Sequence, residues 1–402
     1  MDRPLRFNVE GMIIYMIKGS ATLQGTMNYA EKHPLLVYQP LVPEGMHISG
    51  AGFGCYRVDV RVPEHQQALT KALLSGINLI DTSANYADGG SERLVGKVLK
   101  DLVLAGGIQR DEVVVVSKVG YLQGENYQLS QERKKAGRPF KELVLYDEGL
   151  EHCIHPDFLA EQLTRSLERL GLETVDCYLL HNPEYYLNWA KQEKVSKAEA
   201  RSEYLGRIRG AFLHLEGEVR LGRINYYGLS SNTFPRPQSH YDFTSLADIW
   251  DIAQSISPDH HFRVIQFPLN LFETAGVTEK NQPDGKSLVE FAVKKSLGIL
   301  TNRPLNAIRE DRLVRLTENV YQGDAIRQVH EFKDKVAALD ASWGKIPTLS
   351  QLALRALRST AGITAVLMGM RREVYVEDVL HELSQPCEAI DRRKTWGQIS
   401  EL

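Results

Sequence analysis

Four side chains that can hold or transfer a proton follow one another along the first half of the chain. Asp81 and Tyr86 lie five residues apart in "INLIDTSANYADGGSERLVG", Lys118 ends "VVVVSK", and His181 ends "VDCYLLH". A tyrosine has a reference pKa of about 10, and a nearby ammonium lowers that pKa by favouring the phenolate. A carboxylate would keep the lysine charged, and an imidazole can orient a carbonyl oxygen. The four residues therefore predict a site that protonates an alkoxide as it forms.

Each of these residues also has an ordinary structural explanation when it is taken alone. An aspartate at a strand end can cap the next helix, and a tyrosine in a turn can simply pack. A lysine at a strand end can extend into solvent, and a single histidine is more often structural than catalytic. The catalytic interpretation therefore depends on whether the fold brings the four side chains together.

Eight short apolar runs can form the strands that position these side chains. The runs cover residues 47–54, 77–81, 113–118, 175–181, 224–231, 264–269, 298–302 and 365–369. Helical patterns follow or separate them at 63–76, 91–103, 155–171, 245–256, 286–296, 348–357 and 375–383. This alternation predicts an α/β fold of the (β/α)8 TIM barrel type, whose strand ends share one mouth. A doubly wound sheet is the weaker alternative, because no strand is followed by a G-x-G-x-x-G turn.

Several segments are additional to the strands and helices of a minimal (β/α)8 barrel. Residues 1–36 are expected to form an N-terminal extension, and residues 37–402 the barrel itself. Long loops are expected after strands three, four and seven, at 121–154, 187–210 and 306–345, with a helical pattern over 323–343 in the last. Insertions that follow barrel strands lie at the mouth, so these loops could wall the site and select its substrate.

The composition narrows the class of protein. The 402 residues are 43% hydrophobic and 25% charged with a net charge of -3, which is ordinary for a globular enzyme and does not suggest a nucleic-acid partner. The four cysteines show no metal or disulfide spacing, and Cys177 is expected to be reduced and packed. No apolar run is long enough for a membrane span, so a cytoplasmic protein without a membrane partner is expected. The sequence predicts no oligomeric state.

The motifs around the four residues resemble those of the aldo-keto reductases. The resemblance rests on "GFGCYRV", "GINLIDTSANYADGGSERLVGKVL" and "SLERLGLETVDCYLLHNPE", and extends over about residues 37–385. It implies that Tyr86 is the general acid/base, Lys118 tunes it, Asp81 pairs with Lys118, and His181 orients the substrate carbonyl. It also implies hydride transfer between a nicotinamide, usually that of NADP with NAD possible, and an aldehyde, ketone or sugar. No metal is implied.

The same resemblance implies contacts with the nicotinamide. Ser230 in "GLSSN" and Gln266 in "VIQFPLN" match residues that bind the carboxamide group. A neighbouring amide is expected next to the serine, where either Ser231 or Asn232 could serve. Asn302 occupies the position of the aromatic residue that usually stacks on the nicotinamide, so this chain departs from the family pattern there.

Two further segments, "TNRPLNA" and "GMRREVYVEDV", resemble the parts of the family that bind the phosphates and adenosine of the cofactor. Their candidate residues are Pro304, Leu305, Gly369, Arg371, Arg372 and Asp378. Arg371 and Arg372 could bind a 2′-phosphate, because a guanidinium binds phosphate in a bidentate manner. They could equally form a solvated basic turn, and Val379 replaces the usual asparagine of this loop.

Three functional interpretations follow. The first is an NADP(H)-dependent oxidoreductase acting on a carbonyl or alcohol. The second is a non-enzymatic, cofactor-binding regulatory subunit on the same barrel. A metal-dependent hydrolase is the weakest, because Asp81 and His181 are the only suitable ligands among the strand ends. Neither the substrate nor the direction of the reaction follows from the sequence.

Overall fold

Eight parallel strands close into a barrel in the computed structural model, which describes residues 5–9, 12–309 and 312–402. In chain order the barrel strands are β5 (Ala51–Gly54), β6 (Leu79–Asp81), β7 (Val114–Val119), β11 (Val175–His181), β12 (Ile224–Ser230), β13 (Phe262–Pro268), β14 (Gly298–Asn302) and β17 (Ala365–Met368). The last strand pairs with the first, with Val366 opposite Ala51. The predicted (β/α)8 barrel is confirmed.

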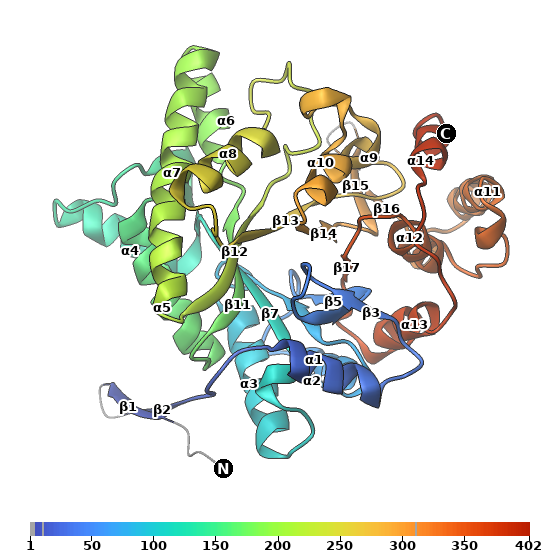
Figure 1. Cartoon of the computed structure of the whole chain (residues 1–402), viewed down its shortest axis with the longest axis horizontal. Helices are drawn as coiled ribbons and strands as arrows, with labels where there is room; N and C mark the ends of the chain where they lie inside the picture. The colour runs from blue at the N-terminus through green and yellow to red at the C-terminus, as the bar shows by residue number, and fades with distance from the viewer. Residues whose placement is uncertain (1–4, 10–11, 310–311) are drawn as a thin grey trace.

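A ring of helices surrounds the barrel (Figure 1). These helices are α2 (Pro63–Leu74), α3 (Gly90–Leu104), α5 (Pro156–Leu170), α7 (Lys197–Arg220), α8 (Leu246–Ile256), α10 (Leu288–Lys294), α12 (Leu349–Arg358) and α13 (Glu373–Leu383). Helix α5 shows how the sequence sets such boundaries. Pro156 fits the first turn, the His155 side chain accepts a hydrogen bond from the Asp157 amide at 3.2 Å, and Gly171 ends the helix with φ 61°.

Alternate residues of each strand face opposite sides of the barrel wall. Leu79, Val114, Val116, Cys177, Leu179, Val264, Leu300, Ala365 and Leu367 form one buried cluster that fills the interior. Their neighbours Ile80, Val115, Tyr178, Leu180, Ile265, Ile299 and Val366 belong to the second cluster, between strands and helices. Cys177 is a free, fully buried thiol, as expected. Because the strand period is two, Asp81, Lys118 and His181 continue the interior rows upward into the mouth.

The first predicted strand is divided in two. Residues 47–54 form β4 (His47–Ser49) and β5, with a bend at Gly50 between them. Ser49 causes the break through two contacts: its Oγ donates to the carbonyl of Ala51 at 2.8 Å, and its amide donates to Asn78 Oδ1 at 2.9 Å. Strand β4 instead pairs antiparallel with β3 (Tyr38–Pro40) and covers the N-terminal end of the barrel.

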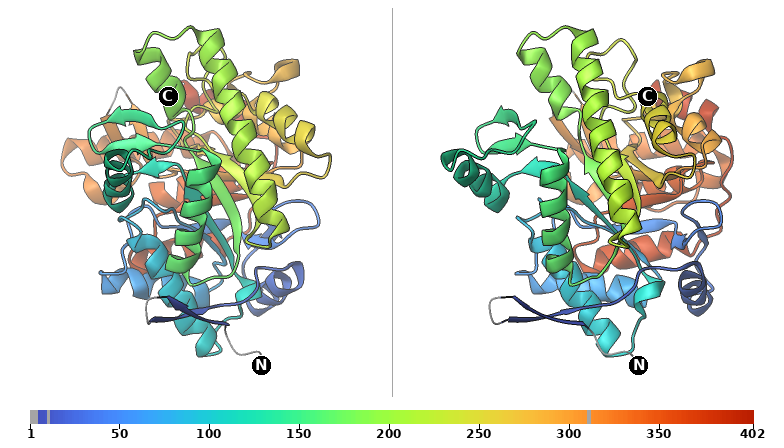
Figure 2. Two further views of the ribbon diagram at one scale, coloured as in Figure 1. Left: turned by 90° about the vertical axis from the view of Figure 1, so that its left-hand side faces the viewer. Right: turned by 60° about the vertical axis from the view of Figure 1, so that its left-hand side comes forward.

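The expected loops after strands three and four contain regular structure. Residues 121–152 form β8 (Tyr121–Leu122), α4 (Gly124–Lys135), β9 (Val144–Asp147) and β10 (Leu150–His152), which stand off the barrel (Figure 2). The expected loop at 187–210 is instead mostly helical, in α6 (Tyr185–Gln192) and the first half of α7. Helix α7 begins at Ser196, whose Oγ accepts from the Glu199 amide at 3.3 Å.

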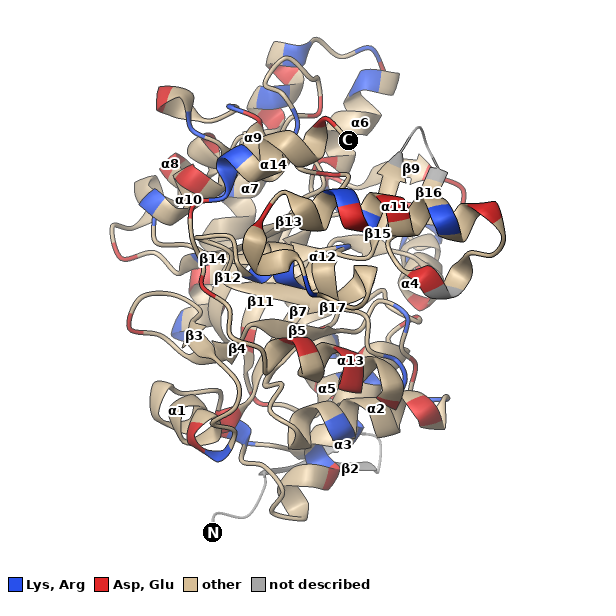
Figure 3. Cartoon of the chain, turned by 90° about the vertical axis from the view of Figure 1, so that its right-hand side faces the viewer, with Lys and Arg blue, Asp and Glu red and all other residues tan. Residues whose placement is uncertain are grey.

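The insertion after strand seven carries the expected helix. It comprises β15 (Asn306–Arg309), β16 (Arg312–Arg315) and α11 (Asp324–Ala338), which lies within the predicted 323–343 pattern. Basic and acidic residues are interspersed along the elements on this side of the molecule, including α11 (Figure 3). Short 3-10 turns occur at Arg110–Glu112, Pro283–Gly285, Glu318–Val320 and Ala341–Trp343, and α9 (Ala275–Thr278) contacts the C-terminal α14 (Arg393–Ser400).

The N-terminal segment begins with a hairpin of β1 (Leu5–Val9) and β2 (Met12–Met16) that extends away from the barrel (Figure 1). Helix α1 (Leu23–Lys32) follows it and packs beneath the barrel. Tyr29 of α1 is 1% exposed and donates to the Leu73 carbonyl at 2.5 Å. In the described part of the chain, no helix combines the length and the apolar character that a membrane crossing requires.

Candidate active site

Asp81, Tyr86, Lys118 and His181 meet at the C-terminal end of the barrel. Lys118 Nζ lies 2.7 Å from Asp81 Oδ2, 2.9 Å from the carbonyl oxygen of Thr82 and 3.4 Å from Tyr86 Oη. The ring centroid of Tyr86 is 5.9 Å from that of His181. The lysine is fully buried, whereas Tyr86 is half-buried. The geometry thus joins all four predicted side chains in one group.

Burial of the side chains affects the pKa values in this group more than the sequence alone indicates. Burial raises the pKa of Tyr86 to about 12, although the Lys118 ammonium acts to lower it. The expected lowering by the lysine is present, but the effect of burial on the Tyr86 pKa is larger. Burial also lowers the pKa of Lys118, but Asp81 and Tyr86 raise it by more, so the lysine remains charged.

His181 is held from three sides. Its Nδ1 lies 3.2 Å from Ser83 Oγ, and its backbone carbonyl accepts from His152 Nε2 at 2.7 Å. The Tyr121 ring packs edge-on against it with centroids 4.8 Å apart. Burial, then the charge of Lys118, lowers the pKa of His181 well below its usual value. Among the described residues no hydrogen-bond partner is recorded for Nε2 of this imidazole, which can therefore bind a carbonyl oxygen.

Three of the expected nicotinamide contacts form one polar chain with the tetrad. Gln266 Nε2 donates to Asp81 Oδ1 at 2.8 Å, and Gln266 Oε1 accepts from Ser230 Oγ at 3.1 Å and from Asn302 Nδ2 at 3.2 Å. Within the described residues, the buried Asn302 Oδ1 has no hydrogen-bond partner. An acceptor left unpaired beside a polar chain suits a ligand that carries a donor, such as a carboxamide.

Ser231 and Asn232 take different positions after β12. Ser231 is buried and its Oγ lies 3.2 Å from Thr233 Oγ1, while its amide donates to the Gln266 carbonyl at 2.9 Å. The side chain of Asn232 is exposed, and its amide donates to Glu184 Oε1 at 2.8 Å. Of the two candidates, Asn232 therefore has the solvent-accessible side chain.

The segment after β14 turns sharply at Arg303, whose φ of 56° is left-handed. An ion pair with Glu273 at 2.9 Å and a hydrogen bond from Asn270 Nδ2 to the Arg303 carbonyl at 3.2 Å hold this turn. Pro304 is buried and Leu305 half-buried, packed against the core. The segment is consequently a fixed wall on the β14 side of the mouth.

Of the candidate cofactor residues after β17, some are exposed to solvent and one is already hydrogen-bonded within the protein. A side chain at Gly369 would meet open space, and both Arg371 and Arg372 are exposed at the start of α13. Asp378 lies within α13, where its carboxylate accepts from Ser350 Oγ at 2.9 Å and from Gln351 Nε2 at 2.7 Å. The arginines are accessible to an anion, whereas Asp378 already joins α13 to α12.

Further aromatic side chains surround the tetrad. Tyr56 contacts the Tyr86 ring at a centroid distance of 5.2 Å, and Tyr121 contacts Tyr185 at 5.1 Å. Tyr185 also approaches Tyr146, at 4.3 Å, from the insertion after β7. Tyr56 and Tyr121 were not among the predicted site residues. Each lies two residues beyond the end of a barrel strand, at Gly54 and Val119, and that position is the signal that could have indicated them.

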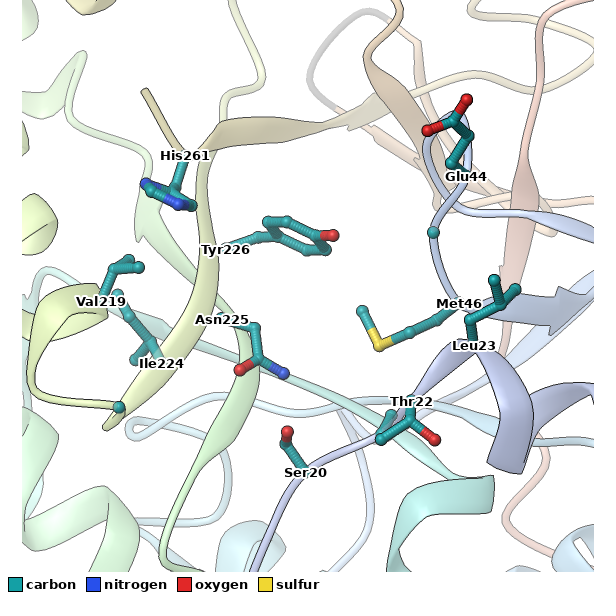
Figure 4. Close-up of a pocket in the computed structure, with 13 residues that line it drawn as sticks. Ser20, Thr22, Leu23, Glu44, Met46, Val219, Ile224, Asn225, Tyr226 and His261 are labelled. Atoms are coloured by element: carbon teal, nitrogen blue, oxygen red, sulfur yellow. The ribbon is translucent and has the colours of Figure 1, made fainter. Parts of the chain in front are cut away.

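Two surface pockets lie at the other end of the barrel. One, with a volume of about 450 Å3, is bordered by the turn before α1 and the beginnings of β12 and β13 (Figure 4). Another, of about 400 Å3, shares Tyr226 with it. Neither pocket is lined by a tetrad residue. Among the described residues, no group of three or more His, Cys, Asp or Glu side chains is arranged to hold a metal.

A family model decides the classification. The model of the Aldo/keto reductase family matches residues 51–391. The chain belongs to the aldo/keto reductase family. The oxidoreductase class expected from the sequence is thereby confirmed at the level of the family.

The sequence identity to individual aldo-keto reductases is low, but an alignment can extend over most of the chain. The L-glyceraldehyde 3-phosphate reductase of Escherichia coli O157:H7 is 24% identical over 364 residues, which cover 88% of this chain and 89% of that protein. The NADH-specific methylglyoxal reductase of Escherichia coli K12 is 37% identical over 106 residues, or 26% of this chain and 27% of that enzyme. These two relatives differ in substrate, so neither assigns one to this chain.

Solved structures agree on the fold. A holo-form aldo-keto reductase from Bacillus halodurans matches with a TM-score of 0.56 and 16% identity, covering 90% of this chain and 96% of that chain. A Klebsiella pneumoniae aldo/keto reductase solved with NADP and acetate matches with a TM-score of 0.54 and 17% identity, covering 90% and 94%. At these identities the likeness shows the barrel alone.

Proposed function

We propose that this chain is an NADP(H)-dependent oxidoreductase that interconverts a carbonyl and an alcohol, with an aldehyde, a ketone or an aldose C1 as the reacting group. The observation that carries the proposal is the contact of Tyr86 Oη with Lys118 Nζ at 3.4 Å, where Lys118 is itself paired with Asp81 at 2.7 Å. The phenol thus has a fixed cationic neighbour in a buried site, which is the arrangement a general acid needs.

In the reductive direction a bound NADPH would supply the hydride to the carbonyl carbon. Tyr86 Oη donates its proton to the carbonyl oxygen as negative charge develops there, and Lys118 stabilises the phenolate that remains. Asp81 holds Lys118 charged and oriented. His181 can donate from Nε2 to the same oxygen in the tautomer whose Nδ1 is unprotonated; Nδ1 then accepts from Ser83 Oγ, 3.2 Å away, once that hydroxyl turns from Asn85 Oδ1, to which it donates at 2.7 Å. Oxidation follows the same path in reverse.

The residues present fit a nicotinamide cofactor. Ser230, Gln266 and Asn302 offer a hydroxyl and two amides side by side, and Asn302 Oδ1 is unpaired within the described part of the chain. Arg371 and Arg372 are exposed at the end of the barrel that carries the tetrad, and the structure records no carboxylate bound to either of them among the described residues. Two accessible guanidinium groups favour a 2′-phosphate and therefore NADP over NAD. With Asn302 in place of an aromatic residue, the nicotinamide would be held by amide contacts rather than stacking.

A tyrosine-to-phenylalanine exchange tests the assigned acid. The Tyr86→Phe variant removes one oxygen, so we expect kcat to fall by about a hundredfold or more while the Kd for NADPH, from fluorescence titration, stays unchanged. Tyr56→Phe is the matched control, because Tyr56 touches the Tyr86 ring but is 67% exposed. Turnover by Tyr86→Phe within a few-fold of wild type would refute the role.

Titration with NADPH and NADH, followed by a screen of aldehydes, ketones and aldoses, tests the cofactor and substrate class. The assembled tetrad favours turnover over the alternative of a regulatory subunit that binds cofactor without catalysis. That alternative predicts tight NADPH binding with no turnover on any of these carbonyl compounds.

A further inference from the structure

The turn that follows His181 connects three strand ends of the mouth. Asn182 adopts a left-handed conformation with φ 49°. Its amide donates to the Ser230 carbonyl at 2.7 Å, and its Nδ2 donates to Tyr121 Oη at 2.6 Å. The turn after β11 is therefore bound both to the segment after β7 and to the end of β12. An αL conformation at a non-glycine residue persists only where the surrounding contacts enforce it.

Glu184 ends this turn and points toward β12. Its side chain is 2% exposed, and Oε1 accepts the backbone N–H of Asn232 at 2.8 Å across 48 positions of sequence. A carboxylate that bonds a backbone amide in a buried site is a strong and directional contact. The contact fixes the backbone of a residue whose own side chain is exposed.

The segment that Glu184 fixes carries the proposed nicotinamide contacts. Ser230 Oγ belongs to the polar chain through Gln266 to Asp81, and the side chain of Asn232, which follows the end of β12, is exposed. We propose that Glu184 is a positioning residue that holds the Ser230–Asn232 segment in the conformation that binds the nicotinamide carboxamide, and that couples this segment to the His181 turn. The inference rests on the proposed function for the identity of the ligand.

The surroundings of Glu184 make this contact sensitive to pH. Burial raises the pKa of Glu184 to about 7, against the backbone amides of Glu184 and Asn232, which lower it. The titratable groups that interact with it electrostatically are Asp242, Tyr121, Tyr185 and Tyr204. The three tyrosines have raised pKa values and stay neutral near pH 7, and Asp242 is paired with Arg236 at 2.5 Å. As the pH falls through about 7, Glu184 becomes neutral and accepts the Asn232 amide less strongly.

Two substitutions at Glu184 distinguish the role of its hydrogen-bond acceptor from the role of its negative charge. Glu184→Ala removes the acceptor, so we expect the Kd and KM for NADPH to rise roughly tenfold with a smaller change in kcat. Glu184→Gln keeps an oxygen acceptor but does not titrate. In wild type the Kd should decrease as the pH rises from 6 to 8, and in Glu184→Gln this component of the pH profile should be absent. An unchanged Kd in Glu184→Ala, or an identical pH profile in Glu184→Gln, would overturn the inference.

Glu216 provides a matched control at the opposite end of the barrel. It is 6% exposed, and its Oε1 accepts the backbone N–H of His261 at 2.6 Å. Glu216→Ala therefore removes the same kind of contact far from the tetrad. We expect it to lower the Tm without changing the Kd for NADPH. A rise in Kd equal to that of Glu184→Ala would show a general loss of stability rather than positioning, and would contradict the inference.

Hydrogen exchange of the protein without cofactor tests the positioning role of Glu184 separately from the proposed NADP(H)-dependent function. In Glu184→Ala the backbone amides of residues 231–233 should exchange faster than in wild type, whereas Glu216→Ala should leave them unchanged. If wild type fails to bind NADPH, the proposed function is wrong, yet faster exchange in Glu184→Ala would still support the positioning role. Unchanged exchange at these amides would overturn that role whatever the cofactor.

Discussion

At the scale of single residues, Tyr86 is subject to two opposing influences. Lys118, 3.4 Å from its hydroxyl, favours the phenolate, and burial favours the neutral phenol. Burial prevails, since the pKa of Tyr86 is about 12. The neutral phenol is the form that donates a proton, so the protein without ligand is prepared for reduction over the whole neutral range.

This protonation state predicts a pH dependence with a definite sign. A group whose folded pKa is raised remains protonated until the pH approaches that value, so kcat/KM for reduction at saturating NADPH should show no loss from Tyr86 between pH 6 and about 10. Oxidation needs the phenolate, whose population rises about tenfold per pH unit in this range. Its kcat/KM should therefore increase with pH. Steady-state profiles in both directions test this, and a fall in reduction near pH 8 would argue against Tyr86 as the acid.

The tetrad could be predicted because the sequence pattern next to each member indicates it. Asp81, Lys118 and His181 end apolar runs, and residues at those ends meet in any closed barrel. Glu184 carries no such mark: its partner Asn232 lies 48 positions away, and the contact exists only after β11 and β12 pair. The net direction of the Tyr86 pKa shift was also hidden, because burial depends on side chains from other strands.

At the scale of elements, the barrel strands and helix α11 could be predicted from the sequence, whereas the other elements of the inserted segments could not. A strand buried on both faces, such as β7 or β11, is apolar along its whole length. The first half of α7 buries only Ala200, Tyr204 and Ile208, one residue per turn between charged neighbours. Such a narrow apolar stripe gives a weak helical period, so residues 187–210 look like a loop until the helix has packed.

Gly228 shows how little space the barrel interior leaves within one of these strands. A Cβ at this position of β12 would lie 2.0 Å from the Val264 carbonyl oxygen and 2.7 Å from Leu179 Cδ2. We expect Gly228→Ala to lower the free energy of unfolding by about 2 kcal/mol or more, because backbone on β13 must move. Urea denaturation followed by circular dichroism measures the change.

The matched substitution is Gly206→Ala in α7, where a Cβ meets no atom within 4 Å. It should raise the free energy of unfolding by about 0.5–1 kcal/mol, because alanine loses less entropy than glycine in a helix. Equal effects of the two substitutions would contradict the packing argument.

At the scale of the whole molecule, the two ends of the barrel have different tasks. The C-terminal end holds the tetrad, while the β3–β4 hairpin and α1 cover the N-terminal end. Asp176 joins these parts: it is fully buried and accepts from the Ala21 amide at 2.7 Å, the Val115 amide at 2.7 Å and Arg110 Nη2 at 2.9 Å. One carboxylate thus binds the N-terminal segment to strand β7 and to the turn before it.

Replacement of Asp176 tests this connection. Asp176→Asn leaves Arg110 buried without its counter-charge, so we expect a loss of about 3–5 kcal/mol in the free energy of unfolding. The exposed Asp259 supplies the control, since Asp259→Asn should change stability by no more than about 0.5 kcal/mol. Denaturant titration of both variants measures these changes in the free energy of unfolding. A loss below about 1 kcal/mol for Asp176→Asn would show that the carboxylate is not needed for stability.

The alternation of the barrel strands has one more consequence. Lys118 continues the interior row of Val114 and Val116, and a slip of β7 by one residue would present Ser117 or Val119 to the mouth instead. A misaligned barrel could keep its helices and much of its apolar burial and still lack the ammonium. Recovery of turnover after refolding is therefore a sensitive assay of strand alignment, which circular dichroism of the same sample would not detect.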